Sequence, residues 1–269
     1  MEPVAANYKP SLFDFGKYAV YADYFKEYIA CKDFKSLGAS LKYMFTNKLP
    51  EKDYNTSSRM GHFLIRNGTT DFQFINEAYE RKVKKYIREH INDFDVFIDA
   101  GACIGEYCVW LAREGKRCIA IEPVNFEAVR KNIALNGLEN RIRLFTCGLG
   151  NKKERVYFHI PNGLPSSSYL ERNASHEPNV DIETFDSLTP QFGIAPGDRV
   201  LMKMDVEGME PELIEGARNF ISGHQHLTLI YEHFESDDYR NDKALSAIAQ
   251  FNFADIDGVN RVAIKKTSN

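Results

Sequence analysis

VFIDAGACIG, at residues 96–105, is the stretch of this sequence that decides the fold. It joins an apolar strand to an acid, a glycine loop and the start of a helix. Gly101 and Gly105 permit unusual backbone dihedrals and a close approach of the main chain to a ligand. A helix N-terminus adds exposed N–H groups and a partial positive charge. The loop has the form D-x-G-x-x-x-G, whereas nucleotide dehydrogenases carry G-x-G-x-x-G. Asp99 would repel a pyrophosphate and would suit a ligand with a cationic amino group.

Outward from this stretch, short apolar segments alternate with amphipathic ones. Such alternation predicts parallel strands joined by helices in a three-layer α/β sandwich. The end of the chain breaks the alternation, because two strand-like runs flank Asp257-Gly258 and predict a β-hairpin. We therefore expect a Rossmann-like fold with a mostly parallel seven-stranded sheet that closes in a C-terminal antiparallel hairpin. The expected strands are 96–100, 117–121, 142–146, 199–204, 227–232, 253–256 and 261–265, and the expected helices are 105–113, 126–136, 210–220 and 242–251.

The sequence predicts two additions to this core. Residues 1–60 carry aromatic side chains at three- and four-residue steps, which predicts a helical extension or cap. Between the third and fourth strands lies an insertion, 150–198. We therefore divide the chain into the extension, 1–60, and an α/β domain, 61–269, that contains the insertion. The expected elements are helices at 12–28, 34–45 and 71–89, a loop at 51–59, strands at 62–66, 155–160 and 180–185, and a Ser-rich loop at 165–168.

Composition narrows the function classes. The chain is 43% hydrophobic and 27% charged, as in ordinary globular proteins. A net charge of −4 argues against a large nucleic-acid footprint. The five cysteines form no C-x-x-C pair, which favours a reduced, cytoplasmic protein without a zinc site. No apolar stretch approaches the roughly 20 residues that span a bilayer, so we expect no integral membrane span.

Further candidate ligand contacts follow the second and third strands. Glu122 comes after the second strand, 23 positions beyond Asp99. An acid at about this distance past the loop can accept hydrogen bonds from both ribose hydroxyls of an adenosine. Cys147-Gly148-Leu149-Gly150 ends the third strand and would lie against the adenine. Together with the glycine loop, these residues predict a nucleoside site.

Acids also follow the fourth and fifth strands. In open α/β sheets, ligands sit outside the carboxyl ends of the strands, and carboxylates there are costly unless they are used or paired. Asp205 is best placed to face a reacting group, whereas Glu207 or Glu210 could instead cap the next helix. Glu232 and His233 reach the same rim. Histidine is the usual general base near neutral pH, although a strand-end histidine is also typical of a polar surface.

Four pieces of the chain resemble the FkbM-type family of class I S-adenosylmethionine-dependent methyltransferases. They are DAGACIGEY (99–107), IEP (121–123), MKMDVEGMEPELIEGA (202–217) and YEH (231–233). Looser matches are NGTTDFQFINEAY (67–79) and VDIETFDSL (180–188), and the resemblance covers about residues 60–265. It implies O-methylation of a hydroxyl on a sugar in a polysaccharide, glycolipid or natural product. Cys103-Ile104 departs from the smaller or polar residues of many relatives, which should alter packing without abolishing binding.

The residues and the resemblance together predict a site. The expected reaction is an in-line methyl transfer from S-adenosylmethionine to an acceptor hydroxyl, which leaves S-adenosylhomocysteine. The general base is Asp205, Glu232 or His233, and the predicted substrate contacts are Asp71, Ser168 and Glu207. We predict no metal site, although the acidic rim could hold Mg²⁺. The predicted cofactor contacts are Asp99, Gly101, Ala102, Gly105, Glu106, Tyr107, Glu122, Pro123, Gly148 and Asp205.

Two other classes stay open at this point. One is an NAD-type Rossmann oxidoreductase, against which the missing G-x-G-x-x-G counts. The other is a non-catalytic nucleoside-binding α/β module, which would not need acids at four strand ends. As partners we expect a small-molecule or glycan acceptor and no nucleic acid. The N-terminal helices and the insertion could wall the acceptor site, or the helices could form a packed cap or a homodimer surface.

Overall fold

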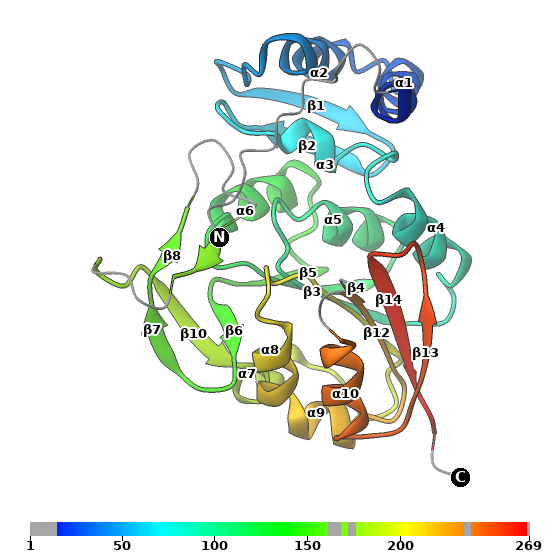
Figure 1. The fold of residues 1–269 in the computed structure, drawn as a ribbon, viewed down its shortest axis with the longest axis vertical. Coiled ribbons are helices and arrows are strands. Elements are labelled where there is room, and N and C mark those ends of the chain that lie inside the picture. The colour runs from blue at the N-terminus through cyan, green and yellow to red at the C-terminus, as the bar shows by residue number, and fades with distance from the viewer. Residues whose placement is uncertain (1–14, 161–167, 172–175, 234–237, 268–269) are drawn as a thin grey trace.

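The computed structural model describes residues 15–160, 168–171, 176–233 and 238–267, and its centre is a seven-stranded sheet (Figure 1). The strand order is β13-β14-β12-β11-β3-β4-β5. Five neighbouring strands are parallel, and β14 runs antiparallel to both β12 and β13. The predicted Rossmann-like sheet with its closing hairpin is confirmed. The strands are β3 (Val96–Ala100), β4 (Arg117–Ile121), β5 (Ile142–Phe145), β11 (Val200–Met204), β12 (Leu227–Glu232), β13 (Phe251–Asp255) and β14 (Asn260–Lys265).

Helices cover both faces of the sheet, which explains the continuous apolar runs of its central strands. Every residue of β3 and of β11 is buried, because side chains that alternate between two packed faces all leave water. Phe97 and Ile98 point to opposite faces and belong to two separate apolar cores. Figure 1 shows α4 (Arg81–Glu89), α5 (Glu106–Arg113) and α6 (Phe126–Leu135) on one face, and α7 (Phe185–Phe192), α8 (Glu210–Gly216), α9 (Arg218–Gly223) and α10 (Arg240–Ser246) on the other.

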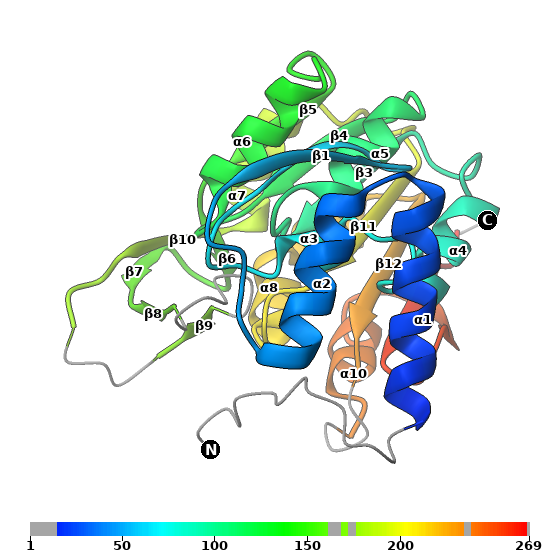
Figure 2. The same ribbon diagram turned by 90° about the horizontal axis from the view of Figure 1, so that it is seen from above.

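The N-terminal segment forms a further layer outside α5 and α6 (Figures 1 and 2). It consists of α1 (Phe15–Ala30), α2 (Phe34–Thr46), β1 (Tyr54–Ser58), β2 (Gly61–Ile65) and the short α3 (Asp71–Phe74). The amides of His62 and Leu64 in β2 donate to the side chains of Asn136 and Asn132 on α6, which ties this layer to the core. Residues 12–14 of the first predicted helix lie outside the described residues. The division of the chain at residue 60 stays a prediction.

The expected loop at 51–59 is wrong, because residues 54–58 form β1. Tyr54 pairs with Ile65 and Ser58 with Gly61 in an antiparallel hairpin. The segment is polar and lacks the alternation of apolar residues that would predict a strand. It becomes one because the backbone of β2 offers a pairing edge, so a tertiary partner supplies what the local pattern lacks.

The insertion forms small sheets of its own, which project to one side of the main sheet in Figure 2. β10 (Val180–Thr184) pairs with β6 (Gly148–Gly150) and β7 (Glu154–Val156), and β8 (Phe158–His159) pairs with β9 (Tyr169–Leu170). The single strand predicted at 155–160 is therefore two short strands. Most of the Ser-rich loop lies outside the described residues, but Ser168 is described.

Three predicted helices are shorter than expected. The helix predicted over 71–89 is interrupted between α3 and α4, where Glu80 adopts a left-handed conformation with φ +47°. The helix predicted over 210–220 breaks at Ala217 into α8 and α9. The helix predicted over 242–251 spans 240–246, and β13 begins at Phe251. The first interruption has a visible cause. The Lys84 ammonium donates to the carbonyls of Phe74, Asn76 and Tyr79 at 3.3, 2.9 and 2.8 Å, which fixes the intervening residues as a turn.

Candidate active site

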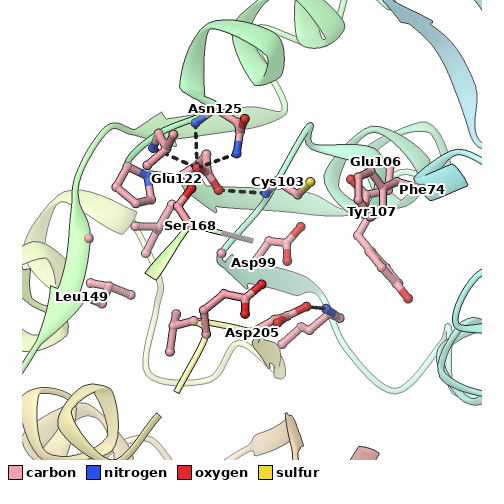
Figure 3. Close-up of a pocket in the computed structure, with 18 of the residues that line it drawn as sticks. Phe74, Asp99, Cys103, Glu106, Tyr107, Glu122, Asn125, Leu149, Ser168 and Asp205 are labelled. Carbon is pink, nitrogen blue, oxygen red and sulfur yellow. Dashed lines mark hydrogen bonds and ion pairs between the residues drawn. The ribbon is translucent and has the colours of Figure 1, made fainter. Parts of the chain in front are cut away.

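A cavity of about 240 Å³ opens at the carboxyl ends of β3, β4, β11 and β12 (Figure 3). Ligands of open α/β sheets bind at this edge because the connections diverge there and leave a crevice. The walls come from these strand ends, from α3 and the turn before α4, from β6 and from Ser168 of the insertion. Residues far apart in the sequence therefore face one space.

Glu122 is the most firmly held acid of the cavity. Its Oε2 accepts a hydrogen bond from the Cys103 amide at 2.9 Å, and its Oε1 accepts bonds from the amides of Val124 and Asn125 at 2.9 and 2.8 Å (dashed lines in Figure 3). Burial raises the pKa of Glu122, although these bonds to backbone amides oppose the shift. Among the described residues, Oε2 accepts only the bond from Cys103, so this oxygen keeps a lone pair that can accept a hydrogen bond from a ligand.

A chain of polar side chains supports Glu122 from behind. Arg66 donates to Asn125 at 2.8 Å and forms a two-pronged ion pair with Asp71 at 2.7 and 2.9 Å. Asp71 is almost wholly buried and lies outside the residues that line the cavity. Asp71 is therefore better placed to orient Arg66 and, through Asn125, Glu122 than to contact a substrate.

Gly101 is needed for packing between two loops. Its φ is +89°, and a Cβ atom at this position would lie 1.8 Å from the carbonyl oxygen of Asp205. The loops after β3 and β11 therefore touch at their backbones, and the Asp205 amide donates to the Ala100 carbonyl at 2.9 Å. Gly105, with φ +80°, would place a Cβ atom 3.0 Å from Val129 on α6. Both glycines thus allow protein segments to approach each other closely, and Gly101 also lines the cavity, so its close approach to a ligand stays a prediction.

Lys203 is the cation around which the acids of the site gather. It is directly opposite Asp99 in the pairing of β11 with β3. Its ammonium lies 2.7 Å from the Asp205 carboxylate and 3.7 Å from that of Glu80. Burial disfavours the charged lysine, but Asp205, Glu80 and Asp99 outweigh burial and raise its pKa well above the ordinary value. Lys203 therefore carries its positive charge at physiological pH and compensates part of the negative charge of these carboxylates.

Asp99 and Glu106 are buried carboxyls that the protein leaves incompletely paired. Burial, with added repulsion from Asp205 and Glu80, raises the pKa of Asp99 to about 7. Burial and the charge of Asp99 raise the pKa of Glu106 to about 8. Glu106 Oε2 is buried and, within the described part of the chain, has no hydrogen-bond partner. Such an oxygen calls for a donor or a cation from a bound molecule.

The turn after β11 places Glu207 in the cavity, whereas Glu210 accepts hydrogen bonds from the backbone of the turn. Glu207 lies in the left-handed region with φ +52° and lines the cavity. Burial, together with the charges of Asp205 and Glu210, raises its pKa to about 7. Glu210 accepts hydrogen bonds from the amides of Val206 and Gly208 at 3.2 and 3.3 Å. Glu210 therefore has the structural role at the start of the helix that the sequence left open for either acid, whereas Glu207 is available to a ligand.

Glu232 completes the acidic rim at the end of β12. Burial, with repulsion from Asp205, raises its pKa to about 8. One oxygen each of Glu80, Asp205 and Glu232 lie within 4.8 Å of one another, a spacing that could hold a metal ion. The Lys203 ammonium already contacts two of these three carboxylates.

The cavity brings most of the predicted site residues together, and four lie outside its lining. Ala102 is buried in the glycine loop, Gly105 packs on Val129, and Asp71 holds Arg66. His233 is buried with its ring stacked on Tyr239, at 4.5 Å between centroids. The predicted residues that do line the cavity are Asp99, Gly101, Glu106, Tyr107, Glu122, Pro123, Gly148, Ser168, Asp205, Glu207 and Glu232.

Sequence reasoning missed Glu80 and Lys203. Glu80 accepts a hydrogen bond from the Tyr107 hydroxyl at 2.6 Å, but in the sequence it stands inside an apparently continuous helix. Lys203 did leave a signal, since it interrupts the apolar strand Leu201-Met202-Lys203-Met204. A charged residue inside a buried strand is rare unless it is paired, so this lysine could have been placed at the site.

The strand order, the closing hairpin and the cavity at the carboxyl edge define a Rossmann-like methyltransferase fold. Among solved structures, the chain is similar to methyltransferase FkbM from Methylobacillus flagellatus KT, with 23% identity and a TM-score of 0.45 over 64% of this chain and 44% of that one. It is also similar to the SAM-dependent methyltransferase from Agrobacterium tumefaciens, with 13% identity and a TM-score of 0.46 over 82% and 72% of the two chains. The chain thus spans less than half of the FkbM structure.

The family is shown by the match of its domain to this sequence. The family described as "Methyltransferase FkbM domain" matches residues 99–257, more than half of the sequence, and the chain belongs to this family. No curated protein matches the chain. No helix in the described ranges is long and apolar enough to cross a membrane.

Proposed function

We propose that this protein is an S-adenosylmethionine-dependent O-methyltransferase that acts on a hydroxyl of a sugar, a glycan or a related natural product. One observation carries the proposal. The amide-held Glu122 and the carboxyls around Lys203 face the same cavity. Family membership supports methyl transfer. The many carboxylates support a polyhydroxylated acceptor, because they accept hydrogen bonds from hydroxyl groups.

The residues of the cavity fit the proposed methyl donor. When bound, S-adenosylmethionine supplies a methyl group already activated by a positively charged sulfur. Glu122 would accept hydrogen bonds from its ribose, and Gly148 and Leu149 would lie against its adenine. The unpartnered oxygen of Glu106 and the carboxyl of Asp99 would face its cationic groups. This match of two incompletely paired acids to a cationic ligand supports the choice of donor over an anionic dinucleotide.

Among the three candidate bases, we assign proton removal to Glu232. Asp205 is engaged by the Lys203 ammonium at 2.7 Å, and His233 lies outside the cavity lining. Glu232 lines the cavity, and its pKa of about 8 lies close to physiological pH. A base with such a pKa combines a useful unprotonated fraction with enough affinity for the proton. Lys203 would orient Asp205 and, through Glu80, the wall around Tyr107.

Calorimetric titration with S-adenosylhomocysteine, with NAD⁺ as the comparison ligand, tests the donor site. We expect the first ligand alone to bind, and Glu122→Gln to weaken it about tenfold or more, because a charge-assisted hydrogen bond contributes about 1.5–3 kcal/mol. Glu139→Gln, at an exposed position, is the matched control. Binding of NAD⁺ in place of S-adenosylhomocysteine would refute the proposed donor.

The base is tested with a methyl donor and a panel of sugar and glycolipid acceptors, read by mass spectrometry. With an accepted compound, Glu232→Gln should lower kcat about 10²–10⁴-fold, the usual contribution of a positioned base, and should leave the affinity for S-adenosylhomocysteine unchanged. His233→Gln should keep nearly full turnover. Unchanged turnover in Glu232→Gln would rule out this assignment, and methyl transfer only to nitrogen or carbon atoms of the acceptors would rule out O-methylation.

A further inference from the structure

Helix α2 turns serines inward and phenylalanines outward. Ser36 and Ser40 are buried, and the Ser36 hydroxyl lies 3.2 Å from that of Tyr54. Phe34 and Phe45 are 66% and 61% exposed. A surface helix normally buries its large apolar side chains and exposes its polar ones. Tyr43 and Met44 are buried beside the serines, so α2 packs on the core through one side and leaves both phenylalanines on the other. Single exposed apolar residues are common, whereas two on one side of a helix suit a partner surface.

The two phenylalanines lie on one side of the helix. They are 11 positions apart, about three turns, which places them on the same stripe roughly 16 Å from one another. Half-buried Leu41 lies between them on this stripe. Lys35 and Lys42 flank it, and both are exposed. The outward side of α2 is thus an apolar stripe with a basic margin.

The surroundings of the stripe are basic as well. Residues 31–52 contain five lysines and two acids, and one of these acids, Asp33, is buried as the N-cap of α2. The other, Glu51, pairs with Lys42 at 2.6 Å. Over the described N-terminal layer, residues 15–74 carry nine Lys and Arg against six Asp and Glu, in a chain whose net charge is −4. The aromatic stripe therefore lies in a layer with a basic excess, within an acidic protein.

The opposite side of α2, which carries the buried Tyr43, packs on α3 at the wall of the active-site cavity. The Tyr28 hydroxyl of α1 donates to the Phe72 carbonyl of α3 at 2.7 Å, and the Tyr43 ring of α2 packs edge-on against the Phe72 ring. The neighbouring α3 residues Gln73 and Phe74 line the cavity. Helix α2 therefore lies between the wall of the cavity and the face that carries Phe34 and Phe45.

We propose that the α2 face, defined as Phe34, Lys35, Leu41, Lys42, Phe45 and Lys48, docks on the surface of an anionic lipid bilayer. The aromatic rings would enter the headgroup boundary and the lysines would meet anionic headgroups. Each lysine near such a surface raises the partition coefficient roughly fivefold. If the proposed function holds, this docking would hold the protein at a surface that carries lipid-linked acceptors, and this extension alone rests on that function.

Charge favours the bilayer over a second copy of this chain. A twofold dimer brings the same surface of two copies together. The lysine margin of one α2 face would then approach the lysine margin of the other, and like charges across an interface oppose association. Anionic headgroups complement the same lysines.

Vesicle flotation of the full-length protein tests the proposal. We expect binding to vesicles of phosphatidylcholine with phosphatidylserine, little binding to phosphatidylcholine alone, and weaker binding as salt screens the lysines. Phe34→Ser with Phe45→Ser should lower the partition coefficient about tenfold or more, because two large apolar side chains are lost. The control is Val259→Ser with Ile264→Ser, which removes apolar residues that are 41% and 43% exposed in the C-terminal hairpin. Thermal unfolding checks that both variants fold.

Each outcome decides the proposal. Binding that requires phosphatidylserine and is lost only in the phenylalanine variant supports it. Absence of binding to both vesicles overturns it, as does equal loss in the two double variants. A concentration-dependent dimer that the phenylalanine variant abolishes, without vesicle binding, would assign the face to a second copy. Calorimetry with S-adenosylhomocysteine separates the two proposals, because its failure would leave the vesicle result standing.

Discussion

Replacing Gly101 by alanine tests the contact between the two loops on which the site is built. The new Cβ atom would lie 1.8 Å from the Asp205 carbonyl oxygen, and the residue would have to keep φ near +89°. A left-handed conformation costs a non-glycine residue about 1–2 kcal/mol, and overpacking adds typically about 1–3 kcal/mol. The Asp205 carbonyl belongs to backbone and has no rotamer by which to move away. We therefore expect a loss of about 2–5 kcal/mol in the free energy of unfolding.

Gly115→Ala is a matched control for this substitution. Gly115 has φ +91°, nearly the dihedral of Gly101, but a Cβ atom added to it would meet no atom of the described residues within 4 Å. It should lose only the conformational part, about 1–2 kcal/mol. Urea unfolding of the two variants gives the difference, and titration with S-adenosylhomocysteine shows whether the displaced loop also weakens binding. Equal destabilisation of both variants, with unchanged binding in Gly101→Ala, would refute the reasoning.

Two further predictions concern buried charge. Lys84→Met removes the donor to three carbonyls and should lower the free energy of unfolding, measured with urea, by about 3 kcal/mol. The control is Lys85→Met at an exposed neighbouring position, which should change this free energy by no more than about 0.5 kcal/mol. The raised pKa of about 8 for Glu106 and for Glu232 means that the folded protein binds more protons than the unfolded chain between the ordinary glutamate pKa of 4.5 and about 8. The stability contributed by these carboxyls should therefore fall as pH rises through this window. Glu232→Gln should make the free energy of unfolding fall less steeply with pH. Urea unfolding at several pH values measures this slope, and the same slope in the variant and the wild type would contradict the prediction.

The central sheet could be predicted because its pattern is local. In β3 and in β12, a short apolar run ends at an acid, and both strands begin and end within a residue of their predicted bounds. The hairpin around Asp257-Gly258 follows from turn chemistry, and Gly258 indeed has φ +90°. These signals need no knowledge of distant residues. The same holds for Glu122, since its place after a strand fixes the edge of the sheet at which it lies.

The elements that failed depend on partners distant in sequence. β1 is a strand only because the backbone of β2 pairs with it, and its own sequence is polar. The turn at Glu80 exists because Lys84 gathers three carbonyls, while the local pattern favours a continuous helix. His233 could not be separated from Glu232 by sequence, because adjacent strand residues point to opposite faces and only the tertiary fold shows which one meets the cavity.

The charge balance of the site depends on one residue more than on any acid. Glu80, Asp99 and Asp205 converge from three elements, and three carboxylates in so small a space would repel one another. Lys203 offsets this repulsion, since its charged ammonium is buried and lies within 3.7 Å of the Glu80 and Asp205 carboxylates. Burial, together with the charges of Asp205 and Glu80, still raises the pKa of Asp99 and gives this residue an affinity for added positive charge. A cationic ligand beside Asp99 would therefore be stabilised by negative charge that the fold gathers there, and burial together with the charge of Asp205 keeps Glu232 basic enough to take a proton.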